Sequence, residues 1–169
     1  MAERATQYTA ALNLSNSDAS TSAMGKSTPD IGTLGENLVA AWLQAEGWVI
    51  LQRRWQCRWG ELDLIAQRQS QLAFVEVKTR SQGNWDANGL LAVTPQKQAK
   101  LWRAAQIFLA DHPKLADLPC RFDVALVGCQ RVPQRPLREQ YRDQDRDQRS
   151  LQINGYQLTL QDYIQAAFG

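Results

Sequence analysis

An aspartate and a glutamate–lysine pair stand in two apolar segments that follow one another closely. Asp63 lies in segment 61–66 and the pair Glu76 and Lys78 in segment 72–79, both with the composition of β-strands. Two carboxylates on neighbouring strands repel each other, and a hard cation such as Mg²⁺ or Mn²⁺ between them removes this cost. Such a cation activates water for attack on a phosphate. The residue types therefore predict phosphodiester hydrolysis, with Lys78 orienting the water or stabilising charge on the phosphate.

The period of two along a strand puts Glu76 and Lys78 on one face, with their Cα atoms about 7 Å apart. The two segments are expected to form a hairpin. If Gln71 begins the pairing opposite Arg68, Asp63 lies across from Glu76. We therefore predict that both carboxylates face one site.

Glu61 shares a face with Asp63, and the same register places it opposite Lys78. We interpret it as an ion-pair partner of Lys78 rather than as a metal ligand. For the whole motif, the alternative is an exposed polar stripe, which is the usual explanation of a lone E-x-K in a strand. The aspartate on the adjacent segment favours the site.

A helix with one apolar face is predicted ahead of these strands. Thr28 and Pro29 have the form of an N-cap and a first-turn proline, and apolar residues recur at helical spacing up to Gly47. The recurring residues are Ile31, Leu34, Leu38, Trp42 and Ala45. Glu36 on this helix would either join the metal site or favour the helix dipole.

A second amphipathic helix is predicted from the cap Thr94–Pro95 to near Asp111. Its apolar face is expected to contain Leu101, Trp102, Ala105, Phe108 and Leu109. Strands are predicted at 48–51 and 121–127. Helix, sheet and helix in this order indicate a mixed α/β sandwich.

Near the end of the chain, Asn154–Gly155 predicts a hairpin turn. A short terminal helix is predicted through Tyr163, Ile164 and Phe168. Asp123 stands beside Arg121 in the core strand, and we interpret it as a structural ion-pair or capping partner rather than as a further metal ligand.

The formal charge is only +2, so nucleic-acid affinity would have to come from a local patch. We predict such a patch from the cations around the proposed site, which are Arg53, Arg54, Arg58, Arg80, Lys97, Lys100 and Arg103. The last three are spaced as a helix ridge, which an ordinary solvated face would also explain. Trp55, Trp59 and Trp85 would stack on bases or, as the commoner alternative, cover a core edge.

Other features exclude several classes of protein. The cysteines Cys57, Cys120 and Cys129 show no C-x-x-C, which argues against disulfides and zinc and favours a cytoplasmic protein. The single histidine, His112, leaves no Ser/His/Asp or Cys/His arrangement. No apolar run is long enough for a membrane span. We expect a disordered segment 1–27 and one domain, 28–169, containing a charged mobile loop at 134–149.

The runs GELDLIA and FVEVKTR, with GENLVAAWL before and CRFDVAL after them, resemble the YraN-type family of uncharacterised bacterial proteins. The resemblance covers about 31–127. It implies the restriction-endonuclease-like PD-(D/E)xK superfold, an α/β three-layer sandwich in which a central mixed β-sheet is flanked by helices. In this sequence Leu62, not proline, precedes Asp63.

Carried over position by position, the resemblance makes Asp63, Glu76 and Lys78 the D, E and K of that superfold. Glu36 matches an extra acid that resembles the one in archaeal Holliday-junction resolvases. Asp63, Glu76 and Glu36 would then be catalytic and metal-binding, and the Val77 carbonyl would add a ligand. The resolvases also suggest a homodimer.

The resulting hypothesis is a Mg²⁺- or Mn²⁺-dependent endonuclease acting on DNA, more than on RNA, that is branched or contains single strands. Two other classes stay open: a nucleic-acid-binding module of the same fold without activity, and an accessory subunit that needs a partner to cleave. An intact D and E-x-K set favours the enzyme.

Overall fold

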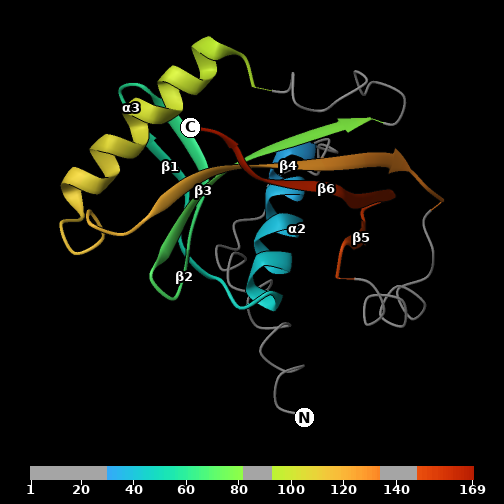
Figure 1. Ribbon diagram of the computed structural model, residues 1–169. Coiled ribbons are helices and arrows are strands. Elements are labelled where there is room, and N and C mark those ends of the chain that lie inside the picture. The colour runs from blue at the N-terminus through green and yellow to red at the C-terminus, as the bar shows by residue number, and fades with distance from the viewer. Residues whose placement is uncertain (1–29, 82–92, 134–147) are drawn as a thin grey trace, which may run out of the picture.

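The computed structural model describes residues 30–81, 93–133 and 148–169, which form two helices and one six-stranded sheet (Figure 1). The elements in chain order are α2 (Ile31–Ala45), β1 (Val49–Cys57), β2 (Gly60–Arg68), β3 (Gln71–Ser81), α3 (Pro95–Asp111), β4 (Cys120–Arg131), β5 (Ser150–Ile153) and β6 (Tyr156–Phe168). The strand order is β1-β2-β3-β4-β6-β5, and only β3 and β4 run parallel. The mixed α/β prediction is confirmed.

The two helices pack on opposite faces of the sheet. Along β3, Ala73 and Val75 belong to the core beneath α2, whereas Phe74 between them belongs to the core beneath α3. Figure 1 shows α2 crossing the middle of the sheet and α3 running along the end that holds β1 and β2. Because both faces of β3 are covered, its apolar run is almost continuous, as expected of a central strand.

The hairpin of β2 and β3 has the predicted register. Arg68 pairs with Gln71, and the backbone pairs continue as far as Leu64 and Val75. The next position along the same register would set Asp63 against Glu76. The turn and the alternation of side chains were therefore enough to align the two strands.

The helix starts differ in how well the sequence predicted them. Thr94 caps α3 and accepts a hydrogen bond from the backbone of Lys97, as predicted. In α2 the cap is Asp30, which accepts from the backbone N–H of Gly32 at 3.1 Å. The helix therefore begins at Ile31, because Asp30, which is closer to the apolar stripe than Thr28, provides the cap. The predicted cap residues Thr28 and Pro29 lie outside the described residues.

The buried stripe of α3 consists of Leu101, Ala104, Ala105 and Phe108. Trp102 was predicted on this face but is 40% exposed, because it sits at the edge of the stripe and covers Phe122 from outside. The first strand is also longer than the predicted 48–51, since β2 offers a pairing edge as far as Gly60.

The predicted terminal helix is wrong. Residues 156–168 form β6, and Tyr163, Ile164 and Phe168 pair with β4. The predicted turn is confirmed: Asn154 and Gly155 both have positive φ, as a tight hairpin turn requires. Two register shifts along β4 and β6 break the period of two, which explains why the sequence pattern looked helical.

No described helix is long and apolar enough to cross a membrane. The predictions for 1–27, for Trp85 and for most of 134–149 concern residues outside the described part of the chain.

Candidate active site

Asp63 lies where β2 separates from β3. Beyond the pair of Leu64 and Val75, no further backbone pair joins the two strands, and the Asp63 carboxylate accepts a hydrogen bond from the backbone N–H of Val77 at 2.7 Å. The side chain thus continues the contact that the backbone of β2 no longer makes. This hydrogen bond holds the Asp63 carboxylate against β3 at the level of Glu76.

Glu76 is a buried carboxylate held by two lysines. Its side chain is 4% exposed, and Oε1 lies 2.7 Å from Nζ of Lys78 and 3.1 Å from Nζ of Lys97. The other oxygen, Oε2, is buried and has no hydrogen-bond partner among the described residues. Burying a carboxylate oxygen without a hydrogen-bond partner costs free energy. This oxygen is therefore available to bind a cation.

A second group of carboxylates meets Asp63 from the α2 side. One oxygen each of Glu36, Glu61 and Asp63 lie within 4.8 Å of one another. The predicted pair of Glu61 and Lys78 is wrong, because β2 has left β3 at this point and Glu61 pairs with Gln56 of β1 instead. Glu61 therefore belongs to an acidic group with Glu36 and Asp63, and not to an ion pair with Lys78.

Burial and nearby carboxylates raise the pKa of two acids of the site, Asp63 and Glu36. Burial and then the nearby Glu76 carboxylate raise the pKa of Asp63 from 3.8 to about 7, although the Val77 N–H opposes the shift. Burial also raises the pKa of Glu36, while the positive charge of Arg54 opposes it. Near neutral pH a proton on Asp63 would therefore compete with a bound cation.

Arg54 is the counter-ion of the outer carboxylates. Its Nε lies 3.2 Å from Glu61 and 3.8 Å from Glu36, and Nη1 donates to the hydroxyl of Thr33 at 3.0 Å. The backbone of Arg54 has φ 49°, a conformation that side-chain-bearing residues rarely adopt. Its neighbour Arg53 points to α2 and donates to Asn37. Two cations of the predicted patch thus bind protein groups in this structure.

Comparison with known sequences covers the part of the chain that forms this site. A family model described as "Uncharacterised protein family UPF0102" matches residues 35–127. The chain belongs to the UPF0102 family. Its relatives include a UPF0102 protein of Trichodesmium erythraeum, which is 51% identical over an alignment 159 residues long. The alignment covers 82% of this chain and 88% of the relative. A UPF0102 protein of Acaryochloris marina is 49% identical, with 82% and 89% covered, and one of Nostoc sp. is 50% identical, with 82% and 94% covered.

The predicted resemblance to the YraN-type family is therefore confirmed. The UPF0102 match at residues 35–127 contains every carboxylate and both lysines of the site. These residues are Glu36, Glu61, Asp63, Glu76, Lys78 and Lys97.

The residues of the UPF0102 chain fit a hard divalent cation. Carboxylate oxygens are the ligands that Mg²⁺ prefers, and Oε2 of Glu76 is a buried oxygen that receives no hydrogen bond from the described part of the chain. Asp63 and Glu76 would hold the ion, and Glu36 or Glu61 would complete its acidic surroundings. Val77, whose carbonyl was predicted as a ligand, contributes its N–H to Asp63.

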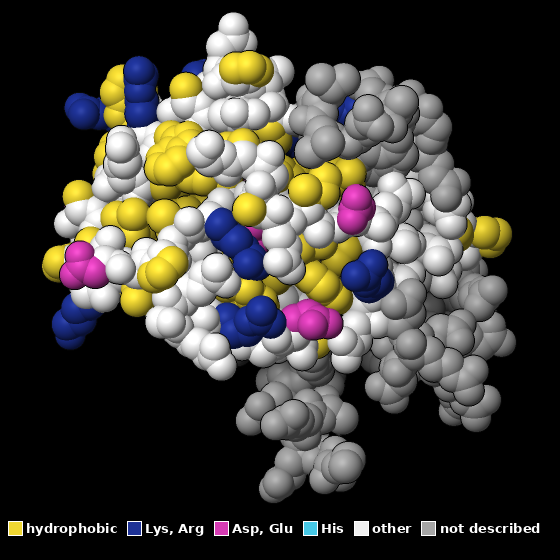
Figure 2. All heavy atoms as spheres, viewed as in Figure 1, with side chains coloured by type: hydrophobic (Ala, Val, Ile, Leu, Met, Phe, Trp, Pro, Cys, Tyr) yellow, Lys and Arg dark blue, Asp and Glu magenta, His cyan; other side chains and the backbone are white. Residues whose placement is uncertain are grey.

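The other predicted basic residues lie in the β1–β2 turn, on α3 and on β3. Arg58 and Arg103 both lie over the ring of Trp59, at 5.5 Å and 4.5 Å, and Lys100 is exposed on α3. Arg80 lies on β3. On the face seen in Figure 2, basic and acidic side chains alternate among apolar ones, so the surface there is mixed in charge.

The role of Lys97 beside Glu76 was not predicted for the UPF0102 chain. The sequence placed this lysine on the polar ridge of a helix, and no local signal shows that the first turn of α3 lies over β3. Asp123, by contrast, is the predicted structural partner. It is fully buried and accepts from Arg121, from the Tyr163 hydroxyl at 2.7 Å and from the backbone of Ala166 at 2.9 Å.

Proposed function

We propose that this UPF0102 protein is a metal-dependent nuclease that hydrolyses phosphodiester bonds in DNA. The observation that carries the proposal is the pair of Asp63 and Glu76. Asp63 is half-buried with its pKa raised to about 7, in part by the charge of Glu76, and Glu76 is buried with an oxygen that no described donor reaches. Both lysines contact Oε1, so these ion pairs leave Oε2 without a partner among the described residues. A cation site explains why this oxygen is left free.

The arrangement of the elements supports a restriction-endonuclease-like sandwich. A mixed sheet has a helix on each face, and the β2–β3 hairpin is followed by α3 and the parallel strand β4. The motif residues lie on the two strands of the hairpin, where that superfold carries its own. Fold alone does not establish an activity, so the proposal rests on the site.

A Mg²⁺ ion held by Asp63 and Glu76 would lower the pKa of a water and offset charge on the phosphate. Reaction adds one water to the phosphorus and breaks one P–O bond, leaving a phosphate monoester and an alcohol. Burial of Glu76 keeps competing water from its oxygens. Asp63 must give up its proton to act as a ligand, so activity is expected to increase as pH rises toward 7.

Lys78 would donate to the attacking water or to the phosphate. Its Nζ is 2.7 Å from Glu76 Oε1, within the site, and its side chain is 27% exposed, so it can reach a phosphate from there. Lys97 approaches the same oxygen from α3 and adds a second positive charge. Donors aimed at developing negative charge stabilise the transition state.

The test is cleavage of labelled duplex, single-stranded, flapped and four-way DNA, and of RNA, with Mg²⁺ or Mn²⁺. Wild type is compared with Glu76→Gln and Lys78→Gln, which remove each charge and leave a polar amide in its place. We expect each substitution to lower the rate by about a hundredfold or more. The matched controls Glu46→Gln and Lys114→Gln alter exposed residues away from the site and should cut at the wild-type rate.

A second candidate, a binding module without activity, is favoured by the charges already present. Lys78 and Lys97 neutralise Glu76, and Arg54 neutralises Glu36 and Glu61, so the carboxylates are compensated even without a metal. This candidate replaces the nuclease if wild type binds DNA but cuts none of the substrates with either metal, and Glu76→Gln binds equally well.

A further inference from the structure

The turn between β1 and β2 carries an indole flanked by two guanidinium groups. Arg58 and Trp59 form the turn between the paired residues Cys57 and Gly60. Trp59 is 36% exposed, and Cζ of Arg103 on α3 lies 4.5 Å from its ring centroid, with Arg58 at 5.5 Å. A large apolar ring is thus held at the surface by cations.

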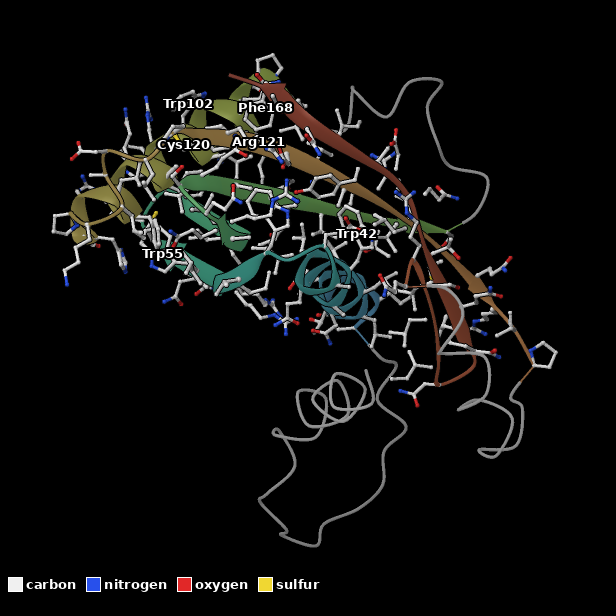
Figure 3. The ribbon with its side chains drawn as sticks, turned by 60° about the horizontal axis from the view of Figure 1, so that its bottom comes forward. Trp42, Trp55, Trp102, Cys120, Arg121 and Phe168 are labelled. Carbon is white, nitrogen blue, oxygen red and sulfur yellow. The ribbon has the colours of Figure 1, made fainter. Side chains whose placement is uncertain are left out.

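Trp59 differs in this respect from two other tryptophans near α3. Trp55 packs edge-on against Phe108 at 5.5 Å and belongs to the core. Trp102 packs against Phe122 at 4.8 Å, and Figure 3 shows it beside Phe168. The ring contacts recorded for Trp59 in the described part of the chain are with arginines only. Contacts with cations, rather than with another aromatic ring, therefore distinguish Trp59 from Trp55 and Trp102.

A row of cations on α3 connects Trp59 with the candidate active site. Lys97 lies 3.1 Å from Glu76, Lys100 follows one turn later on the exposed side, and Arg103 lies against Trp59. Six residues of helix span about 9 Å. A row of that length can contact more than one phosphate of a strand that lies along it.

We propose that a single-stranded nucleic acid runs along this row, with phosphates on Lys100 and Arg103 and an unpaired base stacked on Trp59 in place of Arg58, the more distant of its two cations. The face of a base is accessible to an indole only when the base is unpaired, because neighbouring pairs cover it in a duplex. Arginine beside the ring adds a planar cation that stacks and binds phosphate. The inference rests on the proposed nuclease function in one respect, the direction of the strand toward Glu76.

The experiment measures binding without cleavage. Fluorescence anisotropy in EDTA would compare labelled oligothymidine, oligouridine and a blunt DNA duplex of equal length. We expect Trp59→Ala to weaken binding of both single strands by about tenfold or more, since stacking contributes roughly 1–3 kcal/mol per base. Trp59→Phe should retain most of the affinity. Arg103→Gln should reduce the slope of log affinity against log salt by about 0.7.

Trp102→Ala is the matched control, since it removes a similarly exposed tryptophan, on α3 rather than in the β1–β2 turn, and should bind as wild type does. Circular dichroism would establish that each variant is folded. The proposal is overturned if wild type does not bind single strands, if Trp59→Ala binds them normally, or if the duplex loses as much affinity as the single strands.

The two proposals fail separately. If Trp59 governs single-strand binding but no substrate is cut with metal, the nuclease fails and this surface stands. If DNA is cut through Glu76 while the Trp59 variants bind and cut normally, the nuclease stands and this surface fails.

Discussion

At Asp63, burial and the charge of a neighbouring carboxylate destabilise the ionised form of the side chain. Its carboxyl is enclosed beside Glu76, and its pKa is raised to about 7. A folded chain that binds a proton more tightly than the unfolded chain becomes less stable as pH rises through that window. A bound ligand can offset this loss of stability. For this reason groups with strongly shifted pKa values are found at functional sites.

The stability of the metal-free protein should therefore decrease between pH 4 and about pH 7, by on the order of 1.4 kcal/mol for each unit of the Asp63 shift. Asp63→Asn keeps an oxygen that accepts the Val77 N–H and removes the titration, so this variant should lose much less stability over the same range. Urea unfolding in EDTA at several pH values measures both. Asp117→Asn, an exposed aspartate, should follow wild type. Parallel curves for wild type and Asp63→Asn would contradict the assignment.

Arg54 should compete with a cation for the outer carboxylates. Arg54→Gln removes the positive charge beside Glu36 and Glu61 and should strengthen Mn²⁺ binding about two- to fivefold, as expected for a partly exposed ion pair. Isothermal titration calorimetry would measure the affinity, with Arg68→Gln as the control because Arg68 binds the opposite end of α2. Weaker binding by Arg54→Gln would mean that the arginine supports the site rather than competing for it.

Among the elements, α2 depends on one close approach to β3. A Cβ on Gly35 would lie 1.9 Å from Oγ1 of Thr79, whereas a Cβ on Gly32, in the same helix, would meet only the flexible Asp30 side chain at 3.2 Å. Because Glu36 follows Gly35 directly, the distance between helix and strand also sets the position of that carboxylate.

Gly35→Ala should destabilise the protein by roughly 1–3 kcal/mol through overpacking, despite the better helix propensity of alanine. Gly32→Ala should be neutral or slightly stabilising. Adding Thr79→Ala to Gly35→Ala removes the clashing oxygen and should recover much of the loss, which chemical denaturation of the four proteins would show. A clash that the double variant does not relieve would place the cause elsewhere.

The terminal strand β6 is held by a buried polar contact. The Tyr163 hydroxyl donates to Asp123, whose carboxylate raises the pKa of that hydroxyl together with burial. Tyr163→Phe leaves a buried carboxylate oxygen with one donor fewer and should cost about 1–3 kcal/mol. Tyr156→Phe is the matched control on the same strand. Equal unfolding free energies for the two variants would show that the hydroxyl of Tyr163 has no special part.

Sequence reasoning succeeded for elements whose signals are local. The cap at Thr94, the turn at Asn154–Gly155 and the register that starts at Arg68 and Gln71 each depend on neighbouring residues. It failed for β6, because residues 160–168 of that strand pair only with β4, from which they are distant in the chain, and the register shifts conceal the alternation.

Across the whole molecule, the candidate site draws on four elements from both faces of the sheet. Glu36 comes from α2, Asp63 from β2, Glu76 from β3 and Lys97 from α3. The two cores that hold these elements are separated by the sheet. A cation bound between them would therefore link both halves of the fold.

Saturating Mn²⁺ should raise the melting temperature by several degrees, since a ligand at a hundred times its dissociation constant contributes about 2.7 kcal/mol. The shift should be larger at pH 8 than at pH 5.5, because Asp63 must lose its proton before it binds the ion. Differential scanning calorimetry with and without EDTA measures it. Glu76→Gln should lose most of the shift and Glu46→Gln should keep it, and an equal shift in both variants would remove Glu76 from the metal site.

The sequence by itself predicted that Asp63, Glu76 and Lys78 lie close together, because strand alternation and a short turn are properties of neighbouring residues. In the structure Asp63 accepts from the backbone of Val77, and Lys78 contacts Glu76. The sequence also determined the family, which the comparisons confirmed. Only the tertiary structure decided that Glu61 turns away from Lys78 toward Arg54, that Lys97 reaches Glu76, and that Trp59 meets Arg103. These contacts join elements distant in the chain, and their geometry follows from how the helices pack on the sheet rather than from any local pattern.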